Sequence, residues 1–490
     1  MKVGRTALLL VPLAVLSRGV AFLVPVVVAR WFGVGMVTDA WFWALSFPTF
    51  ALVLASTAVG TASLPALARA QVSAPERLGQ IAGGLMAWAG LVSGAVGLTL
   101  SLALPLALPY VTAFDAETQR LATGLLWALV PFMALTCAGA VLRVTAEVLG
   151  RFQAVAITPV LRATIVISAM GALRGPLGPY ALPAGLLAGE VAQVLYWAWL
   201  GRQRGVRVRL SLSLDETVRQ VGRDLAPILG GEVLVALNLV IDKGFAATLP
   251  TGSVATLEYA DRARVIPQTV LESSLLMVGF ATWSNLRAAG RVAEARASMD
   301  AALRWTLALA APPLAGMYIG REILVRLMFE RGAFGPEDTA TTAAVLGWFI
   351  PGILPNLLGI LAVRAHVVER NLRLVFGMGL LSVLLNTLGD AALIGPWGIE
   401  GLALATTLNN LVVPGVYVIA LRPAWRGTAW LGPLGVAAAS AAVAALVELR
   451  WGAPTSLLDP VLWGAALGCF ALLGLGVAST GLRPAPAAGG

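Results

Sequence analysis

Long apolar runs, separated by short basic or turn-forming segments, fill most of this chain. A transmembrane helix needs about 20 mostly apolar residues, and the pattern predicts fourteen of them. The predicted spans are residues 7–30, 39–67, 80–110, 121–149, 154–173, 180–200, 225–248, 256–286, 301–319, 339–364, 373–393, 399–421, 430–448 and 461–480. Charged residues lie inside several runs, where a charge costs at least about 2.5–3.5 kcal/mol. Because such residues usually line a polar pathway or pair with one another, the pattern favours a transporter.

The composition agrees with an all-α integral membrane protein. Hydrophobic residues make up 58% of the 490 and charged residues 12%, whereas a soluble protein carries roughly 25% charged residues. The formal net charge of +9 comes mainly from arginines in the short segments between spans. There they set membrane orientation, so we expect no nucleic-acid partner. The segments that hold more arginine lie on the side of the N-terminus, which predicts that both termini are cytoplasmic.

The two halves of the chain contain matching positions. Phe114 precedes the fourth predicted span and Phe334 the tenth, and a proline follows each at the same interval, Pro131 and Pro351. The second span, which opens near Asp39, resembles the eighth in the same way. Corresponding elements lie six spans apart and therefore share an orientation in the membrane. We expect two parallel, pseudo-symmetric six-helix lobes around a central cavity.

The repeat also predicts where the lobes end. Residues 1–210 would form the N-terminal lobe with spans one to six, and residues 211–424 the C-terminal lobe with spans seven to twelve. Residues 425–490 hold spans thirteen and fourteen, which lie outside the repeat. We expect these two helices to pack against one lobe and to form a groove for a lipid tail.

Several local motifs resemble those of one known family, in the same order along the chain. They are Ser17-Arg18, Ala29-Arg30-Trp31-Phe32-Gly33, Thr38-Asp39-Ala40, Tyr259-Ala260-Asp261-Arg262, Phe329-Glu330-Arg331-Gly332-Ala333-Phe334 and Gly398-Ile399-Glu400-Gly401-Leu402. The family is that of the MurJ (MviN) lipid II flippases, within the multidrug/oligosaccharidyl-lipid/polysaccharide exporter superfamily. The resemblance implies a protein of the bacterial cytoplasmic (inner) membrane. Its substrate would be lipid II, the undecaprenyl-pyrophosphate-linked peptidoglycan precursor, moved from inner to outer leaflet by alternating access.

The resemblance also implies a cationic cavity for the pyrophosphate. Arg18 and Arg262 occupy two of the family's cavity arginine positions, and a guanidinium group can bind phosphate oxygens in bidentate fashion. The chain departs from the family at Val24-Pro25 and at Leu52, where the family carries charged cavity residues. Three other arginines are candidate substitutes, namely Arg143, Arg162 and Arg264.

Simpler interpretations of these charged residues stay open. Arg143 and Glu147 are four residues apart, as are Glu258 and Arg262, so each couple is a candidate ion pair on one helix face. For Arg143 this interpretation is favoured. Asp39 is either a cap of the second span or, by the resemblance, a gate residue. His366, the single histidine, is expected at the interface between a helix and the cytoplasm.

A second group of residues predicts a cation site. Asn386 and Asp390 are four residues apart and share one face of the eleventh span, while Asp242 lies in the seventh and Thr406 in the twelfth. Hard cations prefer oxygen ligands of this kind. The resemblance implies a sodium site at these positions, completed by the backbone carbonyl of Leu402. A salt bridge to Lys243 is the alternative for Asp242, although adjacent residues on a helix do not face each other.

Enzymatic function finds no support, since the sequence contains neither an ATP-binding Gly-rich loop nor a nucleophile elbow. Sodium, the membrane potential, or both are the candidate energy sources, and we expect a monomer that contacts membrane lipids. Two alternatives to a lipid II flippase remain. One is a flippase for another polyprenyl-linked glycan, and the other is a regulatory family member that does not transport.

Overall fold

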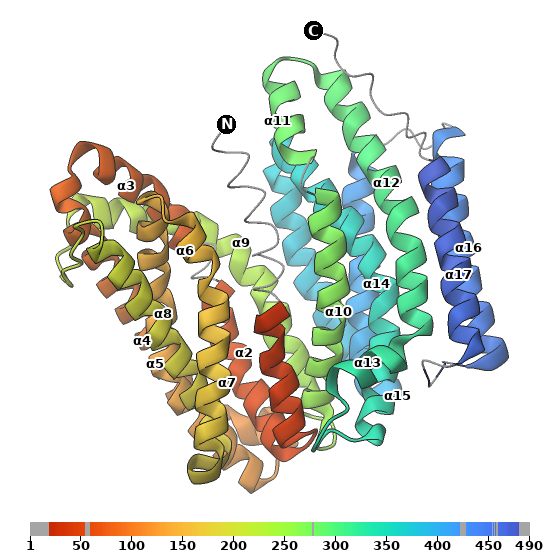
Figure 1. Ribbon diagram of the computed structural model, residues 1–490, viewed down its shortest axis with the longest axis horizontal. Coiled ribbons are helices and arrows are strands. Elements are labelled where there is room, and N and C mark those ends of the chain that lie inside the picture. The colour runs from red at the N-terminus through yellow and green to blue at the C-terminus, as the bar shows by residue number, and fades with distance from the viewer. Residues whose placement is uncertain are drawn as a thin grey trace. The chain divides into compact units, whose positions relative to one another are not determined.

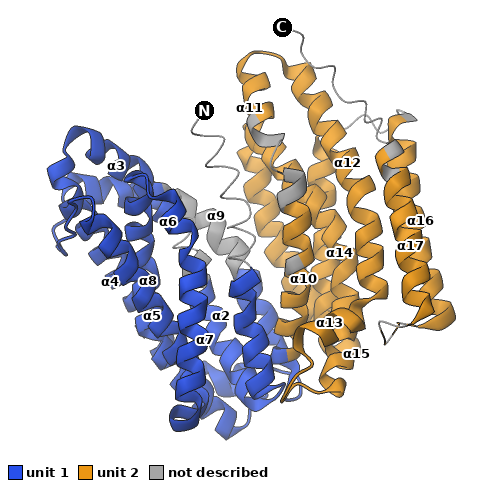
Figure 2. Ribbon diagram, viewed as in Figure 1, with its two compact units in different colours: residues 1–255 blue, residues 256–490 orange. Residues whose placement is uncertain are grey.

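A computed structural model describes residues 19–53, 59–276, 279–421, 428–452, 454, 456 and 459–479. Every regular element in these ranges is a helix. The chain divides into two compact units, unit 1 over Met1–Ala255 and unit 2 over Thr256–Gly490 (Figure 2).

Unit 1 is built around the long helix α5. Its elements are a helix over Gly19–Phe32, α2 (Met36–Val53), α3 (Gly60–Ser73), η2 (Pro75–Arg77), α4 (Leu78–Val111), α5 (Ala116–Val148), α6 (Phe152–Ala156), α7 (Thr158–Leu177), η3 (Gly178–Tyr180), α8 (Ala181–Arg202) and α9 (Glu216–Ala246). Helices α2, α4 and α8 pack against α5, and α7 packs against α8 (Figure 1). The carboxylate of Asp115 begins α5 by accepting a hydrogen bond from the Thr118 amide at 2.9 Å.

Small residues let the helices of unit 1 approach closely. A Cβ atom at Gly139 of α5 would lie 2.9 Å from Val194 and 3.2 Å from Trp197, both on α8. Without a hydrophobic driving force between helices in lipid, such close packing is the main source of association. Glycine at this position therefore fixes the distance between α5 and α8.

Unit 2 contains the remaining helices. They are α10 (Ser253–Leu276), whose first residues belong to unit 1, α11 (Gly279–Ala288), α12 (Val292–Ile319), α13 (Arg321–Phe329), α14 (Pro336–Val368), α15 (Leu372–Ala420), η4 (Thr428–Trp430), α16 (Leu431–Trp451) and α17 (Pro460–Ser479). Helix α14 packs along α15, and α12 packs against α14, α16 and α17. The guanidinium of Arg321 binds both carboxylate oxygens of Glu448 at 2.7 and 2.8 Å, which joins the start of α13 to the end of α16.

Among the described residues, six helical stretches are long and apolar enough to cross a membrane. They are Pro75–Val111, Ala116–Val148, Phe152–Arg202, Pro336–Val368, Leu372–Ala420 and Leu431–Trp451. Two of them are longer than one bilayer crossing and correspond to pairs of predicted spans. The all-helical membrane fold is therefore confirmed, whereas the count of fourteen spans stays a prediction.

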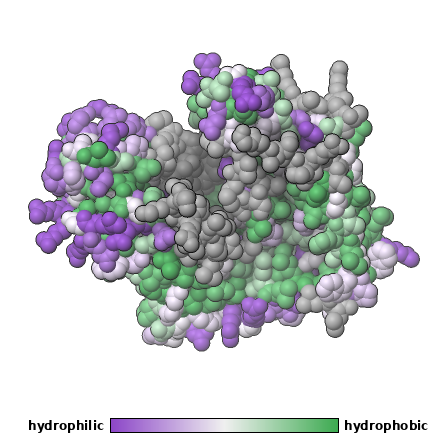
Figure 3. Space-filling view, turned by 45° about the horizontal axis from the view of Figure 1, so that its top comes forward, coloured by the Kyte–Doolittle hydropathy of each residue, from purple (hydrophilic) through white to green (hydrophobic). Residues whose placement is uncertain are grey.

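The outward faces of these helices are apolar. Helix α4 exposes Leu91, Val92, Val96, Leu98, Leu102 and Leu106, and α17 exposes Trp463, Leu467, Phe470 and Leu475. Figure 3 shows one face of the molecule, on which hydrophobic side chains form broad areas and hydrophilic ones gather in separate groups. Exposed apolar area on this scale is typical of a surface that lipid covers.

The predicted internal repeat has a structural counterpart. Helices α5 and α14, which follow Phe114 and Phe334, are both 33 residues long and contain Pro131 and Pro351. The next helix pair turns at a glycine in each half. Gly178 has φ 55° and ψ −128°, and Gly398 has φ 54° and ψ −132°. These two glycines are as far apart in the sequence as Phe114 and Phe334.

The compact units differ from the predicted lobes in one respect. The boundary follows Ala255, beyond the predicted end of the N-terminal lobe at residue 210, because α9 packs against α2, α3 and α4. Helices α16 and α17 pack against α12. The division into two transport lobes and the lipid-tail groove stay predictions.

The turn glycine of α15 gives a direct test of this geometry. Gly398→Ala should lower the free energy of unfolding by about 1–3 kcal/mol, because a side chain is strained at this positive φ. Gly395→Ala is the matched control: this residue lies in the same turn, has helical backbone and offers open space to a Cβ atom. Thermal unfolding in detergent compares the two, and equal midpoints would contradict the assigned backbone conformation.

Candidate functional site

Asp39 joins α2 to the start of α10. It lies in the first turn of α2 and is 1% exposed. Its carboxylate accepts hydrogen bonds from the amides of Gly252 and Ala255, the latter at 2.8 Å. These donors belong to the N-terminal turn of α10, where amides have no partner within the helix. Asp39 therefore caps α10 and not its own helix, which corrects the interpretation of Asp39 as a cap of the second span.

The backbone at Gly252 makes this contact possible. Gly252 has φ +98°, and a Cβ atom there would lie 2.9 Å from Val34. Only glycine fits without displacing Val34 or straining the backbone. The segment before α2 and the segment before α10 consequently lie against each other, and the Asp39 carboxylate occupies the contact.

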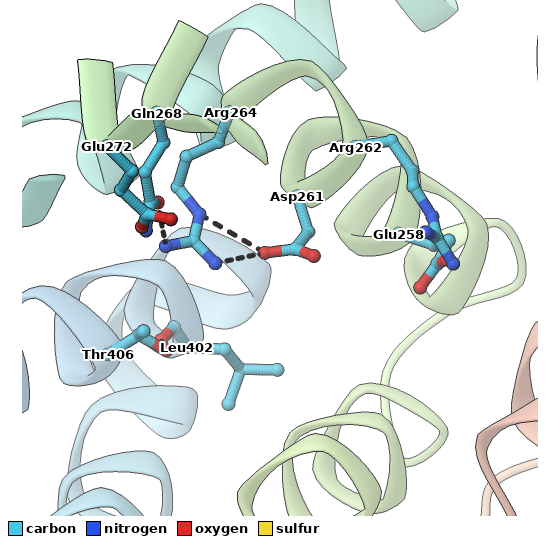
Figure 4. A network of polar contacts seen from close by, with 8 residues as sticks. All are labelled: Glu258, Asp261, Arg262, Arg264, Gln268, Glu272, Leu402 and Thr406. Atoms are coloured by element: carbon cyan, nitrogen blue, oxygen red, sulfur yellow. Dashed lines mark hydrogen bonds and ion pairs between the residues drawn. The ribbon is translucent and has the colours of Figure 1, made fainter. Parts of the chain in front are cut away.

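Helix α10 carries two arginines on different sides (Figure 4). Arg262 donates from Nε to Glu258 Oε1 at 2.7 Å; the Glu258 side chain is 2% exposed and that of Arg262 is 41% exposed. Arg264 binds Asp261 on the other side, and its guanidinium lies 5.2 Å from the ring centroid of Phe349. The predicted helical pair of Glu258 and Arg262 is confirmed.

The two remaining substitute arginines also have carboxylate partners. Arg143 pairs with Glu147 at 3.0 Å, as the helical-pair interpretation predicts. Arg162 of α7 pairs with Glu190 of α8 at 3.1 Å, and Glu190 is almost completely buried. Each of these guanidinium groups is thus neutralised within unit 1.

Three predicted cavity positions are described in part or not at all. Arg18 lies outside the described residues, and so does the side chain of Leu52. Val24 lies in the helix over Gly19–Phe32 and is partly exposed. The later part of that helix is held by Trp31, which packs against Gly171 of α7 and under the guanidinium of Arg174 at 5.0 Å.

Four of the predicted cation ligands lie in α15. Asn386 Nδ2 donates to Asp390 Oδ2 at 3.2 Å, and these residues are 1% and 0% exposed. Beyond the turn at Gly398, Thr406 Oγ1 donates to the carbonyl of Leu402 at 3.1 Å. The structure therefore brings the predicted ligands together in two pairs, one on each half of α15.

Close packing holds the two halves of α15 together near these pairs. A Cβ atom at Gly389 would lie 3.0 Å from Cβ of Ala405. Gly389 adjoins Asp390, and Ala405 adjoins Thr406. Farther from the turn, Asn409 Nδ2 donates to Ser382 Oγ at 2.9 Å. The predicted ligand pairs lie between this contact and the turn.

A cavity of about 300 Å³ with both polar and apolar wall residues adjoins the same helices. Its polar lining residues are Asn356, Arg364, Ser382, Asn409, Asn410 and Tyr417. Asn409 is 7% exposed, and its Oδ1 atom has no hydrogen-bond partner among the described residues. The cavity has room and partners for water, so polar groups continue from the ligand pairs to this cavity within unit 2.

Asp242, the fifth predicted ligand, lies in α9 and so in unit 1. Its neighbour Lys243 is 5% exposed and places its ammonium group 6.0 Å from the ring centroid of Phe42 on α2. The described residues contain no cluster of three or more His, Cys, Asp or Glu that suits a metal ion. A cation site here would therefore depend on amide, hydroxyl and carbonyl oxygens beside its carboxylates.

The loop Phe329–Phe334 has a structural role. The rings of Phe329 and Phe334 lie 5.8 Å apart, and each lies within 5.3 Å of the ring of Tyr259 on α10. All three side chains are buried. Such aromatic contacts add about 0.5–1.5 kcal/mol each beyond the area that they bury. The loop thus fixes the part of α10 that carries Glu258 and Arg262.

Sequence reasoning missed some contacts between helices. His366 is 1% exposed, with Nε2 2.9 Å from the carbonyl of Tyr417, so α15 covers it, and its expected position at the interface with the cytoplasm stays a prediction. The Arg162–Glu190 pair joins residues on two helices, which no helical spacing reveals. The sequence signal for this pair was Glu190, an acidic residue within an apolar run.

These observations define a class of protein. Long apolar helices, buried ion pairs and a buried carboxylate with amide and hydroxyl neighbours make up a polytopic membrane transporter. Residues 28–458 match the family described as lipid II flippase MurJ. The chain therefore belongs to the lipid II flippase MurJ family.

Individual relatives agree with this assignment. A probable lipid II flippase MurJ of Haemophilus influenzae is 24% identical over 424 residues, which cover 81% of this chain and 82% of that protein. One of Synechocystis sp. is 25% identical over 467 residues, with 89% and 85% covered. With one of Bdellovibrio bacteriovorus the identity is 26%, and the match spans 46% of this chain and 44% of that protein.

Solved structures support the fold. The structure titled "Lipid II flippase MurJ, inward closed conformation" superposes with a TM-score of 0.78 at 20% identity, covering 96% of this chain and 97% of that one. An inward-facing multidrug resistance MATE family transporter gives a TM-score of 0.65 at 15% identity, with 83% and 93% covered. The fold expected from the motifs is therefore confirmed.

The Asp39 contact leads to a stability prediction. Asp39→Ala should destabilise the protein by about 1–3 kcal/mol for each buried amide left without an acceptor. Asp115→Ala, which removes an exposed cap of α5, should lower stability by about 1 kcal/mol. Thermal unfolding in detergent ranks the two variants. The assigned role of Asp39 is wrong if its variant is no less stable than the Asp115 variant.

Proposed function

We propose that this protein moves lipid II from the inner to the outer leaflet of the bacterial inner membrane by alternating access. Membership of the family over residues 28–458 carries the proposal. The names of the relatives and the fold support it. The proposal takes the chain as a monomer. It places both termini in the cytoplasm, because arginines concentrate in the segments on that side.

Arg18 and Arg262 would hold the pyrophosphate, with Asp39 as a gate. The exposure of its side chain favours this role for Arg262. Its side chain is 41% exposed although its partner Glu258 is buried, so the guanidinium can reach a second anion while it keeps the first. For Asp39, the bond to the first turn of α10 is a contact that a change in helix position would make or break.

A flippase for another polyprenyl-linked glycan is the second candidate. It is favoured by Val24-Pro25 and Leu52 at positions where charged residues were expected, and by the carboxylate partners of Arg143, Arg162 and Arg264. A regulatory role without transport is a further outcome. Depletion of the protein, followed by assay of lipid II in the inner leaflet, separates these functions.

Sodium is the proposed coupling ion, with the membrane potential as an additional or alternative energy source. The buried Asp390 carboxylate with Asn386 on one half of α15, and Thr406 with the Leu402 carbonyl on the other, support it. Carboxylate, amide, hydroxyl and carbonyl oxygens are the ligands that a hard cation such as Na⁺ prefers. In this proposal Asp242 completes the site. One charge that crosses the membrane contributes about 2.3 kcal/mol per 100 mV.

The substrate arginines give the first functional prediction. Arg18→Ala should weaken substrate binding by roughly one to two orders of magnitude, because a hydrogen bond to a charged group contributes about 1.5–3 kcal/mol. Arg18→Lys should restore part of it, since lysine lacks the bidentate geometry. Flipping in reconstituted vesicles measures the effect, and unchanged flipping by Arg18→Ala would contradict the assignment.

Arg262 needs a design that separates binding from stability. Arg262→Ala removes the partner of buried Glu258 and should also lower stability by about 1–3 kcal/mol. The double variant Glu258→Gln with Arg262→Gln keeps the helix surface polar without a lone charge. Both variants should lose flipping, but the double variant should keep more of the stability. Normal flipping by the double variant would exclude Arg262 from the substrate site.

The sodium proposal predicts ion-dependent stability. An ion at one hundred times its Kd stabilises the folded state by about 2.7 kcal/mol, so NaCl should raise the melting temperature above that in KCl. Asp390→Asn should remove this difference. Glu190→Gln, which removes another buried carboxylate, is the matched control and should keep it. Equal stabilisation of the parent by sodium and potassium would show that the site is not sodium-selective.

A further inference from the structure

A second cavity lies within unit 1, and none of the residues discussed as substrate or ion ligands is among its wall residues. Its volume is about 430 Å³, within the range of small-ligand sites. Helices α3, α4, α5 and α9 surround it. Apolar side chains supply most of the wall, among them Leu85 and Val92 of α4, Met133 and Val141 of α5, and Val218 and Val221 of α9.

The polar groups of the wall leave little to hold water. Ser63 donates to the carbonyl of Val59, and Ser93 donates to the carbonyl of Met133 at 3.2 Å. The indole Nε1 of Trp88 is shielded from solvent and has no hydrogen-bond partner among the described residues. Because buried water needs two to four polar partners, the cavity suits a hydrocarbon occupant better than a water cluster.

The cavity is continuous with the exposed apolar surface of α4. Val92 and Val96 belong to its wall, yet 57% and 43% of their surface is exposed. Leu214, on the segment before α9, is also both a wall residue and 47% exposed. A hydrocarbon chain can therefore enter from the bilayer without crossing polar surface.

One positive charge lines the same cavity. Arg219 of α9 is exposed, and no ion pair or side-chain hydrogen bond of it occurs among the described residues. The neighbouring acids already have partners: Asp215 accepts from the Val218 amide, Glu216 from Arg223, and Asp224 from Gln220. Arg219 is therefore available to an external anion.

We propose that this cavity binds one acyl chain of an anionic phospholipid, whose phosphate contacts Arg219. The apolar wall matches the chain, and the single guanidinium matches a single phosphate. A polyprenyl pyrophosphate carries more negative charge on a much longer chain, so the membrane phospholipid is the better fit. The site does not depend on the proposed flippase activity.

Three variants of α9 test the site. Arg219→Ala removes the charge, and Arg223→Ala is the matched control one turn later, since Arg223 pairs with Glu216 and lies outside the wall. Gly222→Leu fills the cavity, because Gly222 lines it and has open space at the Cβ position. The full chain is reconstituted with phosphatidylglycerol or phosphatidylcholine, and native mass spectrometry counts the phospholipids that remain bound.

The parent and Arg223→Ala should retain phosphatidylglycerol in preference to phosphatidylcholine. Arg219→Ala should reduce that preference roughly fivefold, since one arginine near a membrane surface contributes about 1 kcal/mol. Gly222→Leu should lose the bound lipid with either headgroup. Equal retention of the two lipids by the parent, or equal behaviour of the Arg219 and Arg223 variants, would overturn the proposal.

Cys137 supplies an independent measurement. It lies in the cavity wall, and the chain has only one other cysteine, Cys469, so Cys469→Ser leaves a single thiol. A membrane-permeant maleimide should modify Cys137 several-fold more slowly in vesicles that contain phosphatidylglycerol, and Arg219→Ala should remove the difference. Protection by a polyprenyl pyrophosphate but not by phosphatidylglycerol would assign the cavity to the substrate and overturn the proposal.

Discussion

Charge compensation within an apolar helix bundle is the constraint on which the candidate sites depend. Arg143, Arg162, Arg262 and Arg264 each contact a carboxylate. An isolated charge at these positions would carry a desolvation cost of several kcal/mol. A pyrophosphate that reaches any of these arginines therefore exchanges or shares a partner and does not meet a bare cation. Binding would then yield only the difference between two ion pairs, which suits a transporter that must also release its substrate.

The same constraint separates what the sequence could predict from what it could not. Pairs four residues apart on one helix, such as Arg143 with Glu147 and Asn386 with Asp390, follow from helix geometry alone. Contacts between helices, such as Arg162 with Glu190, depend on the position of each helix along its neighbour. The contact of His366 with the Tyr417 carbonyl of α15 was missed for the same reason.

Asp39 illustrates a further limit. Its place at the start of a helix correctly indicated a capping role, and Asp is a preferred cap. The amides that it binds, however, belong to a helix that begins more than two hundred residues later. Local sequence identifies a residue that needs donors, whereas only the fold decides which helix supplies them. The family motifs carried more information here because they marked both Asp39 and the Tyr259–Arg262 segment of α10.

The internal repeat explains why the buried amide and carboxylate occur in one half of the chain. The two turn glycines, Gly178 and Gly398, are equivalent positions of the repeat. At the same spacing in the sequence, the equivalents of Asn386, Asp390 and Thr406 in unit 1 are Val166, Met170 and Leu186, in that order. Both helix pairs close around a small residue: a Cβ atom at Gly185 would meet Met170, and one at Gly389 would meet Ala405. In unit 1, methionine and valine fill the gap between the helices. The ion pair between these two helices, Arg162–Glu190, lies farther from the turn. In unit 2 the equivalent gap holds polar side chains beside a cavity that Asn409 and Ser382 line. The shared turn sets the helix spacing, and the side chains at three positions decide whether that space is apolar or holds polar groups.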